Sequence, residues 1–252
     1  MERLTDGVEL LDGPLDDVSV LAGNLRDLRR INRWLGGVQL SGAGIEALTA
    51  HRPEVTLLDV GTGGADIPLA LLDAAERRGR RLAVVAIDDR PEIVAVARAA
   101  AEAASVDLAR LEIMVADGRS IPFADRSYDV AHASLVLHHL EPDDAVRLLS
   151  EMGRVARLGI VVNDLDRSRL GWLGAWLVGH LLTGNRYTRR DAPLSVRRAY
   201  RRDEAADLIR EAGLIPVSTF RGAFGQRYAI AAVPGWQVVD PPELLGLRGV
   251  DA

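Results

Sequence analysis

Three aspartates recur at a constant interval and could line one ligand site. Asp59, Asp88 and Asp117 are each 29 residues apart, and each closes or nearly closes a short apolar segment. One strand–helix–strand unit takes about 30 residues, so the interval predicts three carboxylates at the carboxyl ends of consecutive parallel strands. Open α/β sheets bind their ligands at that edge. A ligand site carrying several negative charges is therefore expected there.

The loop after the first of these segments, residues 59–66, is rich in glycine. Glycine lets a ligand approach the backbone closely, and similar loops hold dinucleotides when the pattern G-x-G-x-x-G/A is complete. Here Asp66 occupies the position that requires a small residue. A pyrophosphate would face Asp59 and Asp66, and like charges about 5 Å apart repel by several tenths of a kcal/mol to a few kcal/mol. A ligand with an ammonium and a sulfonium group would instead be attracted.

The elements that must position these residues alternate between strands and helices. This order implies right-handed crossovers and a mostly parallel sheet with helices on both faces. The two last strands, 215–220 and 227–232, have a short connection that requires an antiparallel pair. The other predicted strands are 55–60, 82–87, 111–115, 128–133 and 159–162, and the helices are 67–78, 91–104, 143–155 and 203–212.

Residues 1–50 are predicted to be helical and to form a cap. One helix has an apolar face and ends at Gly36-Gly37, and a short second helix is expected at 44–49. Next to the glycines, Asn32, Arg33 and Trp34 could touch a ligand, although a solvated charge is the more ordinary role for an arginine on a helix. The apolar face consists of Leu21, Leu25, Leu28, Ile31 and Leu35, at spacings of three and four residues.

Composition excludes several classes of site and partner. The 252 residues carry a net charge of −5, which gives no overall basic footprint for nucleic acid. The absence of cysteine excludes disulfides and Cys-ligated zinc, and the absence of lysine excludes a Walker-type phosphate loop. The longest apolar segment, 170–182, is too short to span a bilayer. With no apolar leader at the first residues, a cytoplasmic location is expected.

Residues 57–66 resemble motif I of the class I S-adenosylmethionine-dependent methyltransferases, whose pattern is D-x-G-x-G-x-G. Asp59, Gly61 and Gly63 match this pattern, and Ala65 replaces its last glycine. The stretch 122–130 is similar to the family's P-F-x-D-x-S-F-D-V segment before strand four. The resemblance is strong over 55–165 and implies the small-molecule, ubiquinone-biosynthesis-like type. It also implies a doubly wound seven-stranded sheet of order 3-2-1-4-5-7-6 with an antiparallel last strand.

The same resemblance assigns roles in S-adenosylmethionine binding. Asp88 is expected to bond the ribose hydroxyls, although Asp89 beside it could compete for that role. Asp117, followed by Gly118, matches the family's acid that holds the adenine amino group. The full set of cofactor-binding residues expected is Asp59, Gly61, Thr62, Gly63, Asp88, Asp89, Asp117, Gly118 and Ser134.

A second group of residues could move a proton. His138 and His139 follow the fourth strand, and Asp164 follows the fifth, which should be its neighbour in this fold. Histidine is largely neutral near pH 7 and can take a proton from a phenol or hydroxyl. A carboxylate on the other ring nitrogen would fix the tautomer and stabilise the imidazolium. Either histidine is thus a candidate base, as in several small-molecule methyltransferases. His132 is expected to pack inside the sheet.

Residues 165–200 interrupt the α/β order and are predicted to form a helical insertion. The segment 170–182 is apolar nearly all round, and arginines crowd behind it. One hypothesis is a lid whose Trp172 and Trp176 wall an aromatic or lipid-like acceptor. The alternatives are a homodimer interface and a surface that rests on anionic membrane. No metal is expected, because the nearby His and Asp residues lack a convincing ligand spacing.

The predicted organisation is a cap at 1–50, a methyltransferase domain at 51–236 that contains the insertion, and an irregular tail at 237–252. The expected reaction is O-methylation of a small apolar hydroxylated aromatic, such as a polyketide-type phenol of specialised metabolism. One alternative is C-methylation of a quinone or related ring. Another is a cofactor-binding module that transfers no methyl group.

Overall fold

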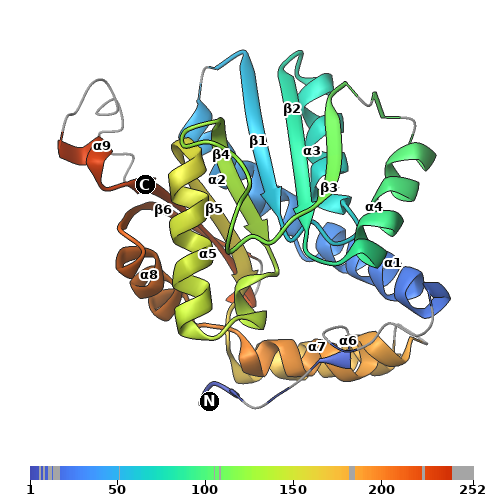
Figure 1. Cartoon of the computed structure of the whole chain (residues 1–252). Coiled ribbons are helices and arrows are strands. Elements are labelled where there is room, and N and C mark those ends of the chain that lie inside the picture. The colour runs from blue at the N-terminus through green and yellow to red at the C-terminus, as the bar shows by residue number, and fades with distance from the viewer. Residues whose placement is uncertain are drawn as a thin grey trace.

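The computed structural model describes residues 1–5, 7, 9–10, 13, 18–50, 52–104, 106–107, 109–181, 185–222 and 225–239. A seven-stranded sheet of order β3-β2-β1-β4-β5-β7-β6 runs through the molecule, and β7 is antiparallel to both of its neighbours, β5 and β6 (Figure 1). The predicted fold class and strand order are confirmed. The strands are β1 (Glu54–Val60), β2 (Arg81–Asp88), β3 (Leu111–Val115), β4 (Tyr128–Ser134), β5 (Ala156–Leu165), β6 (Leu214–Arg221) and β7 (Arg227–Pro234).

Helices cover both faces of the sheet because its central strands are apolar on both sides. In β1, Leu57 packs with the core under α2, α3 and α4, whereas Leu58 packs with the core under α5 and α8. This alternation follows from the period of two in a strand. The covering helices are α2 (Gly37–Thr49), α3 (Asp66–Arg77), α4 (Pro91–Ala103), α5 (Pro142–Val155) and α8 (Arg202–Glu211), and the short α9 (Trp236–Val239) follows β7.

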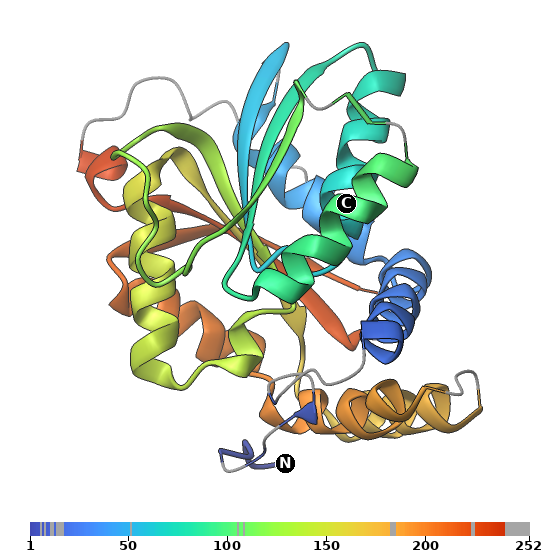
Figure 2. The ribbon, with the colours of Figure 1, turned by 45° about the vertical axis from the view of Figure 1, so that its right-hand side comes forward.

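Three further helices lie at the edge where the parallel strands end. α1 (Val18–Trp34) runs beside this edge, and α6 (Arg169–Leu181) and α7 (Arg186–Arg198) form a pair beneath it (Figures 1 and 2). A single 3-10 turn, η2 (Leu137–His139), follows β4 and lies against α7. The insertion predicted at 165–200 thus covers the ligand edge of the sheet. Within the described residues, no helix is long and apolar enough to cross a membrane.

Two elements differ from expectation by three residues or more at a boundary. α2 begins at Gly37 and not near residue 44, because Gly36 alone takes the left-handed turn (φ 78°) and Gly37 already belongs to the next helix. β5 covers Ala156–Leu165 and not only 159–162. Of the apolar face predicted on α1, Leu21 and Leu25 are buried. The side chains of Leu28 and Ile31, and the predicted tail beyond residue 239, lie outside the described part of the chain.

Candidate functional site

A cavity of about 990 Å³ lies at the carboxyl edge of the sheet. Its walls come from the loops after the parallel strands, from α1 and from the α6–α7 pair. Both candidate bases, His138 and His139, line it, whereas Asp164 lies behind His138. Every residue expected to bind the cofactor is part of its wall: Asp59, Gly61, Thr62, Gly63, Asp88, Asp89, Asp117, Gly118 and Ser134.

The glycine loop after β1 is held open by left-handed backbone. Gly61 and Gly63 have φ of 68° and 54°, and a Cβ at position 61 would lie 2.5 Å from a methyl of Val136. Asp88 closes the loop, because its carboxylate accepts the Gly63 N–H at 3.0 Å and the Arg90 N–H at 3.2 Å. Burial raises the pKa of Asp88 to about 6, although both N–H groups oppose the rise. The neighbouring Asp89 is exposed.

Asp117 sits at the end of β3 and is held by an arginine that sequence reasoning missed. Its carboxylate accepts hydrogen bonds from the Arg119 backbone N–H at 2.8 Å and from its guanidinium at 3.0 and 3.1 Å. These bonds hold the pKa of Asp117 below its usual value. Arg119 also donates to Asp144 at 3.0 Å. Beside them Gly118 leaves no room for a side chain, since a Cβ would lie 2.5 Å from Val60.

Asp59 has a protein partner that was not foreseen. The β1–β4 register places it opposite His132, and His132 Nδ1 lies 2.5 Å from its carboxylate. The other ring nitrogen lies 2.7 Å from the Ser41 hydroxyl, which in turn accepts the Asn163 amide at 2.8 Å. A neutral His132 that donates from Nδ1 satisfies all three groups. His132 therefore packs inside the sheet as expected, and it also fixes Asp59.

A buried arginine, Arg227 at the start of β7, organises the floor of the cavity. It donates to Asn163 at 2.6 Å, to Asn32 at 2.6 Å and to the Ser134 hydroxyl at 2.8 Å. The side-chain amide of Asn32 in turn donates a hydrogen bond to the Asp66 carboxylate at 2.9 Å. Burial lowers the pKa of Arg227 to about 10, against the attraction of nearby carboxylates. Asn32 thus lines the cavity as predicted, but it does so as a link between two side chains.

His138 and Asp164 form a buried pair. His138 Nδ1 lies 2.7 Å from one carboxylate oxygen of Asp164, which also accepts the Leu165 N–H, and the other oxygen accepts the His138 N–H at 3.2 Å. Burial alone would raise the pKa of Asp164, but the charge and hydrogen bond of His138 outweigh it and lower that pKa. When the ring is neutral, Nδ1–H donates to the ionised Asp164 and Nε2 carries the lone pair.

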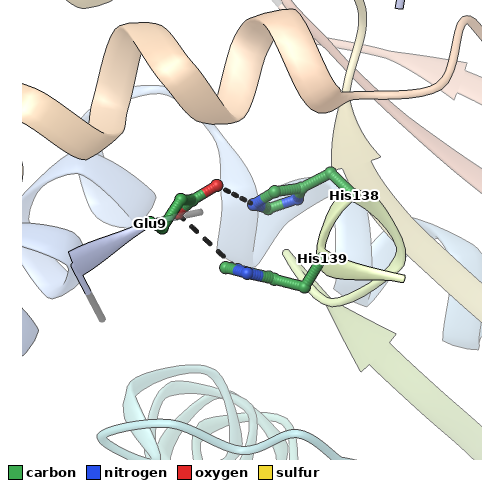
Figure 3. Close-up of side chains that lie close together, drawn as sticks. All are labelled: Glu9, His138 and His139. Atoms are coloured by element: carbon green, nitrogen blue, oxygen red, sulfur yellow. Dashed lines mark ion pairs between the residues drawn. The ribbon is translucent and has the colours of Figure 1, made fainter. Parts of the chain in front are cut away.

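The N-terminal segment adds a carboxylate to this end of the cavity. Glu9 is buried, and its two oxygens lie 3.9 Å from His138 Nε2 and 4.0 Å from His139 Nε2 (Figure 3). The imidazole rings lie against each other, 4.2 Å apart. Glu9 and the two histidines are residue types that bind metals. However, the Arg198 guanidinium also lies 3.9 Å from Glu9, so a permanent positive charge already faces this carboxylate.

The two tryptophans predicted to wall the acceptor site do not line the cavity. Trp172 and Trp176 lie on the outer side of α6 and are partly exposed. On α1, Arg33 and Trp34 are exposed and also lie outside the cavity wall, in keeping with a solvated charge at position 33. The residues of α6 that do line the cavity are small or aliphatic: Leu170, Gly171, Gly174, Ala175 and Val178.

Comparison with known proteins agrees with this geometry. A family described as "Methyltransferase domain" matches residues 57–159. The ubiquinone/menaquinone biosynthesis C-methyltransferase UbiE of Dinoroseobacter shibae is 30% identical over 204 residues, which are 75% of this chain and 76% of the relative. The chain belongs to the class I S-adenosylmethionine-dependent methyltransferases.

Solved structures share the fold of this methyltransferase at low sequence identity. A SAM-dependent methyltransferase from Aquifex aeolicus matches with a TM-score of 0.58 and 19% identity, over 86% of this chain and 97% of that chain. The mitomycin 7-O-methyltransferase MmcR matches with a TM-score of 0.57 and 23% identity, over 86% of this chain and 60% of that chain.

The charges on the wall of the methyltransferase cavity suit a cationic cofactor. Among the described residues, the wall holds three arginines and seven acids, which are Glu9, Asp59, Asp66, Asp88, Asp89, Asp117 and Asp191. Negative walls concentrate ligands of opposite charge. Thr62 also lines the cavity, and its buried hydroxyl has no hydrogen-bond partner among the residues that the structure describes. The negative charge of the wall and the available Thr62 hydroxyl both fit S-adenosylmethionine.

Proposed function

We propose that this methyltransferase methylates an oxygen of a small, apolar hydroxylated aromatic, such as a polyketide-type phenol of specialised metabolism. One observation carries the proposal: His138 lines the cofactor cavity and has its Nδ1 fixed by Asp164, which leaves Nε2 as the nitrogen available to an acceptor. A methyl transfer to a hydroxyl needs a group at this place, since the acceptor must lose its proton. A transfer to an amine or thiolate makes less use of it.

The chain's own residues supply the proton transfer and the positioning. S-adenosylmethionine, when bound, provides an activated methyl group on a sulfonium that leaves readily. His138 Nε2 takes the acceptor proton, and Asp164 stabilises the imidazolium that results. The carboxylate of Glu9, 3.9 Å from Nε2, adds a second negative charge beside the developing positive one. Alignment of acceptor and cofactor can contribute about 7–11 kcal/mol in favourable cases.

The cavity wall opposite the histidines favours an apolar acceptor. α6 presents aliphatic or small side chains there, among them Leu170, Ala175 and Val178. Leu140 and Leu165 continue this surface on the side of the sheet. An aromatic ring without charged substituents would bury its faces against these groups, whereas a sugar or nucleotide would find few partners. The acceptor is therefore proposed to be a phenol of low polarity.

Mass spectrometry on a panel of hydroxylated aromatics tests the proposal. With S-adenosylmethionine, an accepted phenol gains the mass of one methylene unit, and proton–carbon correlation spectra place the new methyl on oxygen. In His138→Ala, turnover should fall by about 10²–10⁴ while S-adenosylhomocysteine affinity, measured by calorimetry, is kept. His180→Ala, at an exposed histidine of α6, is the matched control. Full activity of His138→Ala would refute this function for His138.

C-methylation of a quinone or related ring is the second candidate, favoured by the name of the 30% identical relative. Such a ring also benefits from a base, so the same panel should include hydroquinones. A methyl on carbon in the product spectrum decides for it. A chain that binds S-adenosylhomocysteine and methylates nothing in the panel would favour a cofactor-binding module. The expected cytoplasmic location stays a prediction.

A further inference from the structure

The outer side of α6 forms an apolar surface that the described part of the protein leaves exposed. It consists of Trp172, Leu173, Trp176 and Leu177, whose exposed fractions range from 36% to 45%. The described residues include ten exposed large hydrophobic side chains in all, and four of them fall within the six consecutive positions of this face. Single exposed hydrophobic residues are ordinary, but a contiguous patch marks an interaction surface. We call these four residues the α6 outer face.

The spacing of this face shows that it is one side of the helix. Trp172 and Leu173 are followed four residues later by Trp176 and Leu177, which is about one helical turn. The exposed His180 stacks on Trp176 with ring centres 4.5 Å apart. The opposite side, which includes Gly174 and Ala175, lines the cavity. A single helix of 13 residues, about 20 Å long, thus separates the acceptor site from the exposed surface.

The charge of the helix pair that carries the α6 outer face favours one kind of partner. Residues 169–202 contain eight arginines and one acid, Asp191, in a chain whose net charge is −5. Asp191 is buried. Among the side chains of this stretch that the structure describes, the exposed arginines are Arg169, Arg189, Arg190, Arg197 and Arg201.

We propose that the α6 outer face rests on an anionic lipid surface, with the tryptophans and leucines in the interface and arginines against the headgroups. Apolar helices flanked by basic residues bind membranes in this way. The helix is too short to span a bilayer, so it lies in the plane of the surface. The cavity then faces the membrane across α6. Insofar as the acceptor is apolar, as in the proposed function, it would reach the site from the lipid.

A second copy of the chain fits this surface less well. The cores of protein interfaces are poor in charge, and a symmetric dimer would place the arginines around one α6 against those of its partner. An anionic membrane supplies the opposite charge instead. The choice between these occupants is open to a direct measurement.

Vesicle sedimentation tests the proposal. The protein should bind vesicles of phosphatidylglycerol and phosphatidylcholine, bind those of phosphatidylcholine alone weakly, and lose affinity as salt is added. Joint replacement Trp172→Gln and Trp176→Gln should weaken binding by roughly tenfold or more. Trp34→Gln is the matched control, because Trp34 is 68% exposed on α1, outside this face. Retained S-adenosylhomocysteine binding checks that each variant is folded.

Three outcomes would overturn the proposal: no binding to anionic vesicles, equal binding by the double variant, or equal loss in the Trp34 control. Light scattering that shows a dimer converted to monomer by the double variant would assign the face to a second copy instead. Failure here is distinguishable from failure of the proposed function. Methylation of a water-soluble phenol without vesicles tests the function alone, and the double variant should retain it.

Discussion

Replacing Asp88 by asparagine removes a buried carboxyl group that contacts the glycine loop. The variant should distinguish the effect of this group on stability from its effect on cofactor binding. Burial raises the pKa of this carboxyl from 3.8 to about 6. The folded protein holds the proton to higher pH than the unfolded chain, so the wild type loses stability as the pH rises from about 4 to about 6. At 1.36 kcal/mol per pKa unit, the full effect is about 3 kcal/mol, of which about 2 kcal/mol develops between pH 4.5 and 7.5.

Urea unfolding at those two pH values measures the effect. Asp89→Asn is the control, since Asp89 is the exposed neighbour and changes the net charge equally. As the pH rises from 4.5 to 7.5, the free energy of unfolding of Asp88→Asn should increase by about 2 kcal/mol relative to that of Asp89→Asn. An amide cannot accept both the Gly63 and the Arg90 N–H, but that cost is the same at both pH values. Equal pH dependence in the two variants would refute the reasoning.

Cofactor affinity gives the second half of this prediction. Hydrogen bonds to a charged group contribute about 1.5–3 kcal/mol, so Asp88→Asn should weaken S-adenosylhomocysteine binding by roughly tenfold or more. Asp89→Asn should leave the affinity nearly unchanged. The reverse pattern would assign the ribose to Asp89 and leave Asp88 with the loop alone.

Three other predictions concern the base, the floor of the cavity and metals. In Asp164→Asn, loss of the charge that fixes His138 should lower kcat by about 10²–10⁴ with S-adenosylhomocysteine affinity kept, and an unchanged kcat would exclude His138 as the base. Arg227→Met should lower the free energy of unfolding in urea by about 3–5 kcal/mol, because it removes a partner from the buried Asn32 and Asn163 and from the half-buried Ser134, and a loss below about 1 kcal/mol would contradict this. Dialysis against EDTA should change neither turnover nor Tm, since Arg198 already faces Glu9. Tight zinc binding that Glu9→Gln abolishes would contradict it.

The sheet and its acidic edge could be predicted because both depend on local sequence. Apolar segments and the interval between Asp59, Asp88 and Asp117 are visible in a single chain, and the topology of parallel strands then gathers their ends. The partner of Asp59 could not be foreseen in the same way. Its contact with His132 depends on the register of two strands 73 residues apart. Only the fold brings these residues face to face.

Other features were missed because their signals are weak or ambiguous. Glu9 precedes the first helix and reaches the histidines across 129 residues of sequence, with no motif around it. Arg227 begins an apolar strand, where a charge suggests an exposed end and not a buried centre. For α6, a helix that is apolar nearly all round does not reveal which side faces inward. The outward position of Trp172 and Trp176 therefore required the tertiary structure.

The bridge from Asp66 through Asn32 to Arg227 limits how the cavity can open. It attaches α1 at its C-terminal end both to the loop after β1 and to the start of β7. Swinging this helix away would remove one of the three acceptors of the buried Arg227 guanidinium and separate the Asn32 amide from Asp66, a costly step for every catalytic cycle. Substrates and products are therefore expected to exchange at another part of the rim, where α6 and α7 meet the N-terminal segment.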